Sequence, residues 1–192
     1  MGRISLIAMG SSTGGTEALA QIIPKLRPPL PPIVIVQHIP PGFSKLFADR
    51  MNGESELTVK EGENGELVKE SHVYVAPGGL HMELTKRGDK LQLRCFMAPH
   101  VHSCRPAVDV LFKSVAKLVG PAALGVILTG IGHDGAAGLL EMRKMGAATL
   151  GQDEASSVVY GMPKSAFECG AVERQVPLQN MALAIMSILH KN

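Results

Sequence analysis

Short apolar segments alternate with helix-like segments at the start of the chain. Ile4–Ala8 is a short run without regular polar alternation; a glycine-containing loop follows it, and Thr16–Ile23 then has the spacing of a helix. The same order repeats in Ile33–Val36 and Phe43–Met51. Strands that are apolar on both faces are typical of parallel sheets covered by helices on each side. The sequence therefore predicts an α/β fold with a doubly wound, mostly parallel sheet.

Residues 57–96 have a different pattern. Glycines separate short alternating segments such as Val73–Val75 and Leu91–Arg94, a pattern typical of β-hairpins. The α/β alternation returns at Val108, and neither a repeat nor a linker interrupts it. One α/β domain over residues 1–192, with a hairpin-rich insertion around residues 57–96, is therefore expected. The further predicted elements are strands at 124–128 and 148–151 and helices at 108–119, 136–145, 163–169 and 178–190.

Composition narrows the function classes. The 192 residues are 45% hydrophobic and 19% charged, which suits one globular domain. A net charge of +2 with few aromatic residues argues against nucleic acid as a partner. The three cysteines are widely spaced without a CxxC pair, so neither a disulfide framework nor a zinc ribbon is predicted, and a cytoplasmic location is expected. The apolar stretches are too short to predict membrane insertion.

A glycine-rich loop follows the first predicted strand and carries the first candidate chemistry. Gly10–Gly15 satisfies the G-x-S-x-G pattern with Ser12 in the nucleophile position. A tight strand-to-helix turn exposes such a hydroxyl, and the N-terminus of the following helix favours a developing oxyanion. The alternative is a phosphate-binding loop, but no lysine follows Gly15 and the glycines lack the GxGxxG spacing. The pattern favours a serine nucleophile.

Two further strand ends carry groups that complement Ser12. His38 follows the second predicted strand, and Asp134 lies in a glycine-lined loop before a predicted helix. The carboxyl ends of parallel strands share one edge of a sheet, so a nucleophile, a base and an orienting carboxylate would meet there. Taken singly, His38 could be structural and Asp134 could be the N-cap of the following helix. The three together predict a Ser-His-Asp arrangement.

Other histidines remain as alternatives. His100, His102 and Cys104 alternate along the chain, and a strand would aim all three to one side as metal ligands. His81 and His133 are alternative bases, and His133 is the more serious because it adjoins the candidate carboxylate. Neither a metal nor an organic cofactor is required by the serine hypothesis.

Several stretches, in matching order, carry a resemblance to a known family. They resemble the C-terminal catalytic domain of the CheB chemotaxis protein-glutamate methylesterases, and the resemblance runs from about Ile4 to the last predicted helix. The stretches are Ile7–Glu17, Gln37–Phe43, Val75–Gly78 with His81–Met82, Arg105–Pro106 with Val108–Phe112, Gly125–Gly138, and Gln152–Ser156 through Gly161–Pro163.

The resemblance implies a specific activity. It implies a doubly wound α/β enzyme that hydrolyses glutamate methyl esters on the cytoplasmic helices of chemoreceptors and, in many members, deamidates receptor glutamines. The family's serine, histidine and aspartate match Ser12, His38 and Asp134, and its oxyanion site includes a backbone N–H at the position of Ile131. Full-length members also carry a receiver domain. None is expected in this chain, which enters its first predicted strand by Ile4, so a regulatory receiver would lie on another chain or have been removed.

The resulting hypothesis is acyl transfer through a glutamyl-enzyme. His38 takes the Ser12 proton, and backbone N–H groups near Thr13 and Ile131 hold the oxyanion. Three other hypotheses stay open: a non-catalytic module that binds receptor helices or coiled coils through the Pro40–Phe43 loop, an esterase for small esters, and a metal-dependent hydrolase built on the cluster that begins at His100.

Overall fold

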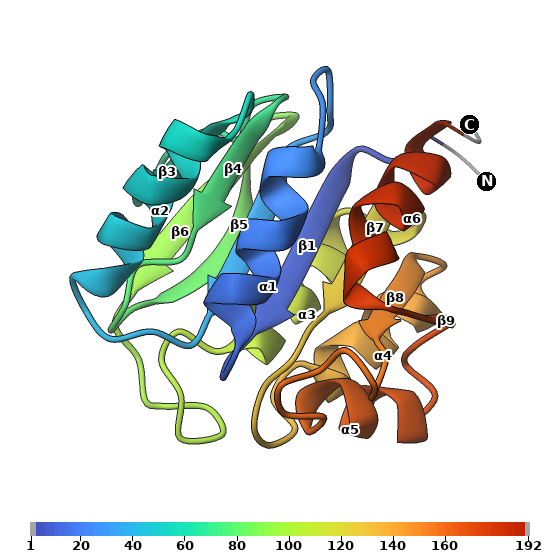
Figure 1. Ribbon diagram of the computed structural model, residues 1–192. Coiled ribbons are helices and arrows are strands. Elements are labelled where there is room, and N and C mark those ends of the chain that lie inside the picture. The colour runs from blue at the N-terminus through green and yellow to red at the C-terminus, as the bar shows by residue number, and fades with distance from the viewer. Residues whose placement is uncertain (1–2, 191–192) are drawn as a thin grey trace.

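The central element is a seven-stranded parallel sheet. The structure is a computed structural model that describes residues 3–190 (Figure 1). The strand order is β3-β4-β2-β1-β7-β8-β9, and every adjacent pair runs parallel. The strands are β1 Leu6–Ser11, β2 Ile33–Gln37, β3 Thr58–Glu61, β4 His72–Val75, β7 Ala123–Ile127, β8 Ala148–Gln152 and β9 Arg174–Val176.

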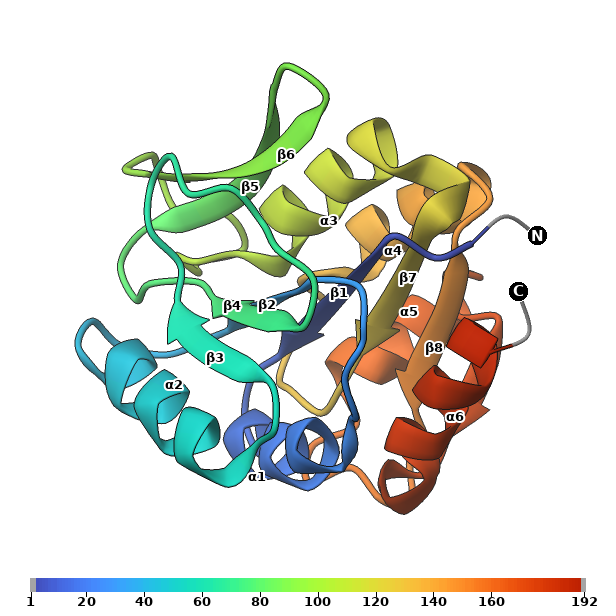
Figure 2. The same ribbon diagram turned by 90° about the horizontal axis from the view of Figure 1, so that it is seen from above.

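Helices cover both faces of this sheet, as the view from above shows (Figure 2). On one face, α1 (Gly15–Ile22), α2 (Phe43–Glu54) and α6 (Leu178–His190) bury their apolar sides. On the other face lie α3 (Val108–Leu118), α4 (Ala136–Lys144) and α5 (Met162–Glu168), together with the antiparallel hairpin of β5 (His81–Arg87) and β6 (Lys90–Phe96). Short 3-10 turns, η1 (Ile23–Lys25) and η2 (Gly120–Ala122), follow α1 and α3. Both faces of β1 and β2 are consequently buried.

The doubly wound fold class predicted from the apolar runs is confirmed. The hairpin prediction holds for residues 81–96. Val73–Val75 differs, because it lies in β4, which pairs in parallel with β2 and extends the main sheet. Strand β9 has no counterpart among the predicted elements, because three residues with one buried position carry too short a pattern to detect.

The lengths of the helices also show whether any of them could span a membrane. Within residues 3–190, no helix combines the length and the apolar character needed to cross a bilayer.

Two glycines offer a matched test of packing between β1 and α3. A Cβ atom on Gly10 would overlap the methyl groups of Val108, whereas a Cβ on Gly53 in α2 would meet nothing within 4 Å. We expect Gly10→Ala to lower the free energy of unfolding by about 1–3 kcal/mol because the strand and helix must move apart. Gly53→Ala should leave it unchanged or raise it by up to about 1 kcal/mol. Urea unfolding of the two variants measures both; equal effects would contradict the packing argument.

Candidate active site

Three loops meet at the carboxyl edge of the sheet, at the lower end of Figure 1. Ser12 follows β1, His38 follows β2, and Asp134 lies between β7 and α4. Strands β2, β1 and β7 are adjacent, so the three loops are neighbours. The backbone continues the pairing beyond the strand ends: Ser12 N–H donates to Thr129 O at 3.0 Å, and His38 N–H donates to the carbonyl of Ser11 at 3.0 Å. The fold thus brings the three predicted residues to one edge.

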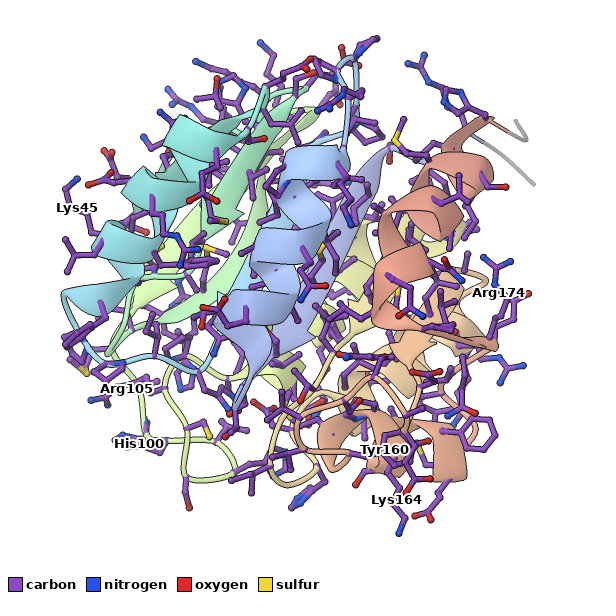
Figure 3. All side chains as sticks on the ribbon, in the orientation of Figure 1. Lys45, His100, Arg105, Tyr160, Lys164 and Arg174 are labelled. Carbon is purple, nitrogen blue, oxygen red and sulfur yellow. The ribbon has the colours of Figure 1, made fainter. Side chains whose placement is uncertain are left out.

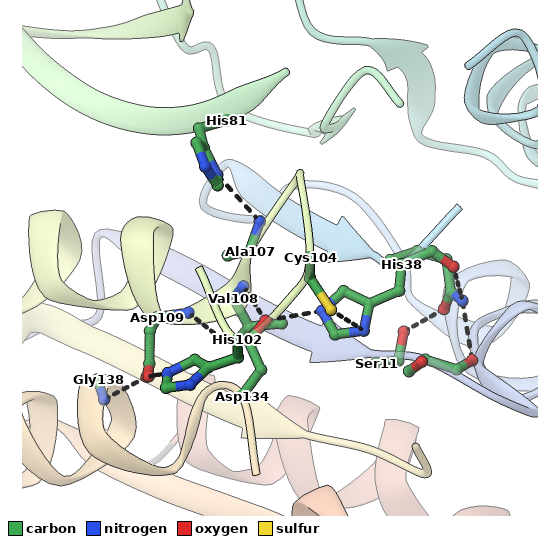
Figure 4. A network of polar contacts seen from close by, with 12 residues as sticks. Ser11, His38, His81, His102, Cys104, Ala107, Val108, Asp109, Asp134 and Gly138 are labelled. Carbon is green, nitrogen blue, oxygen red and sulfur yellow. Dashed lines mark hydrogen bonds and ion pairs between the residues drawn. The ribbon is translucent and has the colours of Figure 1, made fainter. Parts of the chain in front are cut away.

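The imidazole of His38 is paired with the carboxylate of Asp134. The Nε2–H group of His38 donates to Asp134 Oδ2 at 2.7 Å, and the aspartate side chain is only 2% exposed (Figure 4). Burial alone would raise the pKa of Asp134, but the hydrogen bonds from His38 and from the N–H groups of Asp109 and Val108 outweigh it and lower that pKa. An ionised carboxylate only accepts, so the proton lies on Nε2 and the lone pair lies on Nδ1.

Asp134 also caps a helix, though not the one that follows it. Its two carboxylate oxygens accept the N–H groups of Val108 (2.7 Å) and Asp109 (2.9 Å), the first two residues of α3. The N-cap interpretation for the helix after Asp134 is wrong: that helix, α4, has Gly135 at its N-cap without a side-chain cap. Instead, Asp109 in α3 accepts Gly138 N–H of α4 at 2.7 Å. Asp134, which precedes α4, therefore caps α3, and Asp109 of α3 caps α4.

Ser12 lies beside this pair without a hydrogen bond to it. Within residues 3–190 its hydroxyl makes no hydrogen bond, and its side chain is partly buried. A Cβ atom on Gly130 would lie 2.7 Å from Ser12 Cβ, so only glycine at that position leaves the loop after β7 this close to the serine. The structure therefore joins His38 to Asp134 and places Ser12 on the neighbouring strand end.

Backbone N–H groups remain available on both sides of Ser12. Thr13 and Ile131 are exposed, and in the described part of the chain neither amide donates a hydrogen bond. Thr13 precedes α1, whose N-terminus adds a positive dipole end. These amides can receive hydrogen-bond acceptors from a ligand.

A buried glutamine that the sequence patterns did not single out connects the two strand ends. Gln37 is 3% exposed, and its Nε2 donates to the carbonyl oxygens of Ser12 (2.8 Å) and His38 (3.1 Å). Ser11 Oγ donates to its Oε1 at 2.5 Å (Figure 4). In the sequence, the one indication of this role is a polar residue at the end of the otherwise apolar strand β2. Gln37 fixes the backbone around the serine and the histidine.

The alternative histidines have other partners. His81 accepts Ala107 N–H on Nδ1 and donates from Nε2 to Pro99 O, so both ring nitrogens are occupied in the interior. His133 is exposed, and its ring lies edge-on to that of His102 with centroids 4.6 Å apart. His81 therefore stabilises a loop. Within residues 3–190, the ring of His133 contacts that of His102, whereas the imidazole that bonds Asp134 belongs to His38.

The residues of the alternative metal cluster separate into different contacts. Residues 101–104 form a tight turn in which Val101 and Cys104 exchange backbone hydrogen bonds, with His102 and Ser103 in the left-handed region. A turn, unlike the strand assumed from the alternation, sends neighbouring side chains apart: His102 Nε2 donates to Asp109 at 2.7 Å, while Cys104 Sγ lies 3.6 Å from His38 Nδ1. His102 and Cys104 therefore contact different partners, and the strand that this alternative requires is not the structure of these residues.

Comparisons with known proteins identify the family of the chain. The CheB methylesterase family pattern matches residues 7–185, and the chain therefore belongs to that family. It is 52% identical over 182 residues to a "protein-glutamate methylesterase/protein-glutamine glutaminase" of Photorhabdus laumondii, covering 95% of this chain and 52% of the relative. The Pectobacterium atrosepticum protein of the same name is 50% identical, with the same coverage. The chain spans about half the length of the curated relatives it matches.

A solved structure is also similar throughout. The crystal structure of the Thermotoga maritima CheB methylesterase catalytic domain aligns with a TM-score of 0.94 at 38% sequence identity. The alignment covers 96% of this chain and 98% of that chain. The similarity therefore extends over the whole sheet and both helical layers.

The shifted pKa of Asp134 makes its contribution to stability depend on pH. Its pKa is lower in the folded protein than the ordinary 3.8, so its stabilising effect is present above that value and is lost as pH falls through the folded pKa. Asp134→Asn removes the titration. We expect the wild type to exceed the variant in free energy of unfolding most at neutral pH, with the difference shrinking below about pH 4. Urea unfolding across this range measures it, and a constant difference would contradict the assignment.

The Ser11–Gln37 bond can be tested by a double-mutant cycle. Gln37→Met leaves the Ser12 and His38 carbonyls and the Ser11 hydroxyl without their partner, so we expect a loss of about 1–3 kcal/mol in the free energy of unfolding. Adding Ser11→Ala should cost less in the Gln37→Met background than in the wild type, because its bond is already gone. Additive losses in chemical denaturation would mean that the two side chains are not coupled.

Proposed function

We propose that the chain is a serine hydrolase that demethylates glutamate methyl esters on the cytoplasmic helices of chemoreceptors. The observation that carries the proposal is the contact between His38 and the buried Asp134 at the same sheet edge as Ser12, in a chain of the CheB methylesterase family. Names of the relatives supply the ester class, and the site supplies residues suited to hydrolyse it.

The tautomer of His38 determines which nitrogen acts. Nε2 is occupied by Asp134, so Nδ1 accepts the Ser12 proton while Ser12 Oγ attacks the ester carbonyl. The imidazolium then protonates the departing methoxide, which leaves as methanol and generates a glutamyl-enzyme. Water attacks the ester of the glutamyl-enzyme by the same route. This step frees the glutamate side chain of the receptor and restores Ser12. Asp134 holds the imidazole in place and stabilises its positive charge throughout.

The amides of Thr13 and Ile131 suit the role of oxyanion donors. Each belongs to a different loop beside Ser12, and each is free of backbone partners among residues 3–190. Two donors of this kind that approach the carbonyl oxygen from separate loops would stabilise its charge as the tetrahedral intermediate forms.

The surface around Ser12 suits a protein substrate. Phe43, Ile131 and Val158 are large apolar residues that are 59%, 65% and 70% exposed. A Cβ on Gly14 would contact Val158, and Ile131 adjoins the glycine that packs on Ser12, so two of the three lie directly beside the serine loop. Apolar exposure around a site favours a macromolecular partner over a small ester.

Deamidation of receptor glutamines would use the same acyl-enzyme. The curated relatives carry the second name protein-glutamine glutaminase. Attack of Ser12 on a carboxamide gives the same glutamyl ester with ammonia in place of methanol, so His38 protonates the leaving nitrogen. We also expect control by a receiver domain, as the family resemblance implies.

Methanol release from a methylated chemoreceptor cytoplasmic fragment tests the reaction and the nucleophile. We expect release from the wild type and a loss of at least roughly 10³-fold in Ser12→Ala, because no acyl-enzyme can form. Ser5→Ala is the matched control, since Ser5 is exposed and directly precedes β1, whereas Ser12 directly follows it; it should behave as the wild type.

Other outcomes select other functions. Equal release by Ser12→Ala and the wild type would remove the serine assignment, and sensitivity of that release to a chelator would favour metal-dependent hydrolysis. Fragment binding without release by the wild type would favour a binding module. Rapid turnover of simple esters without release from the fragment would favour a small-ester hydrolase.

A further inference from the structure

Cys104 lies against the atom of His38 that the proposed reaction uses. Its Sγ is 3.6 Å from Nδ1, the ring nitrogen that does not hydrogen-bond Asp134 (Figure 4). The tight turn at residues 101–104 holds the cysteine there through two backbone hydrogen bonds of 3.0 and 2.9 Å. The thiol and the imidazole are therefore placed by different elements, the turn and the end of β2, that face each other.

The two atoms have the separation of two ligands of one zinc ion. Zinc–sulfur and zinc–nitrogen bonds of about 2.3 and 2.0–2.1 Å at a tetrahedral angle place the ligands about 3.5 Å apart. The structure already holds Sγ and Nδ1 at 3.6 Å. A thiolate and a neutral imidazole are also the two side-chain groups that zinc binds most often in proteins.

The surroundings supply what a bound cation needs beyond its direct ligands. Asp134 accepts the other ring N–H of His38, the carboxylate–histidine arrangement that orients metal-binding imidazoles. His38, Cys104 and Asp134 have potential ligand atoms all within 4.8 Å of one another. A thiolate and a carboxylate together supply two negative charges, against one positive charge from Arg105 on the wall of the same hollow.

The position is also accessible from solvent. His38 and Cys104 line an open hollow with His100, Ser103 and Arg105. His100 and Arg105 lie on the loop after β6, at the lower end of the molecule, as Figure 3 shows. Water can therefore reach the cation and fill its remaining coordination positions.

We propose that Cys104 Sγ and His38 Nδ1 form a binding site for a thiophilic divalent cation of the zinc class, and that the bound cation inhibits hydrolysis. The thiol proton leaves to solvent as the metal–sulfur bond forms. The cation then occupies the lone pair that would accept the Ser12 proton. Inhibition, but not binding, rests on the proposed function.

Zinc titration of the whole chain without substrate tests the binding. By calorimetry we expect one Zn²⁺ per chain, with at least roughly tenfold weaker binding in Cys104→Ser, because a hydroxyl is a far poorer zinc ligand than a thiolate. Cys169→Ser is the matched control, since Cys169 is exposed and its thiol donates to the carbonyls of Ala136 and Ala166. It should bind zinc as the wild type does.

Cobalt spectroscopy identifies the ligands directly. Co²⁺ in the wild type should show a thiolate-to-cobalt charge-transfer band that is absent from Cys104→Ser and weakened in His38→Gln, with circular dichroism confirming that each variant is folded. Equal zinc affinity in Cys104→Ser and the wild type, or a cobalt band that disappears in Cys169→Ser instead, would overturn the site.

Methanol release separates the two proposals. We expect Zn²⁺ to suppress release by the wild type and a chelator to restore it. The ratio of rates with and without zinc should lie closer to one in Cys104→Ser. If the wild type releases no methanol at all, the proposed function fails while the zinc titration still decides the site. Zinc that binds through Cys104 but leaves the rate unchanged would overturn the inhibitory role.

Discussion

The arrangement of the site depends on the carboxylate of Asp134. It accepts three hydrogen bonds, from the imidazole of His38 and from the first two N–H groups of α3. These bonds offset the cost of keeping a buried group ionised, and so the proton stays on Nε2 of His38. Because Asp109 caps α4 in return, the two helix N-termini, the end of β2 and the loop after β7 form one connected polar unit beneath an apolar sheet.

Close contacts at three glycines give the loop that carries Ser12 its position. Gly10 lies against Val108, Gly15 lies against Gln37, and Gly130 lies against Ser12, each where a Cβ atom would overlap or crowd its neighbour. The glycines of the first loop therefore do more than allow a turn, because they let β1 approach the helix behind it and the strand end beside it. The hydrogen bonds of Gln37 to the carbonyls of Ser12 and His38 then hold these two strand ends in the positions that the close packing allows.

Much of the fold follows from local pattern, whereas parts of the site do not. The apolar runs at β1, β2, β7 and β8 predict a parallel sheet because both faces of each strand are buried, and the order of loops at one edge follows from that sheet. Side-chain direction is less predictable. The alternation of His100, His102 and Cys104 suggests one cluster, but two left-handed residues turn the chain and send His102 and Cys104 to different partners. The structural role of Gln37 is not predicted because amide side chains have no catalytic sequence pattern. Asp134 caps a helix that precedes it in the sequence, and local capping patterns describe only the helix that follows a residue.

The capping of α3 from a distance has a consequence for how the molecule assembles. Ala107, at the N-cap of α3, offers no side-chain acceptor, and the acceptor that serves instead, Asp134, is 26 residues beyond Val108; the His38–Asp134 contact spans 96 residues. Contacts of such large sequence separation form only after long loops have closed. The His38–Asp134 pair is therefore absent from partly folded states with well-formed helices and strands, and a nascent chain cannot form this pair before its second half has docked.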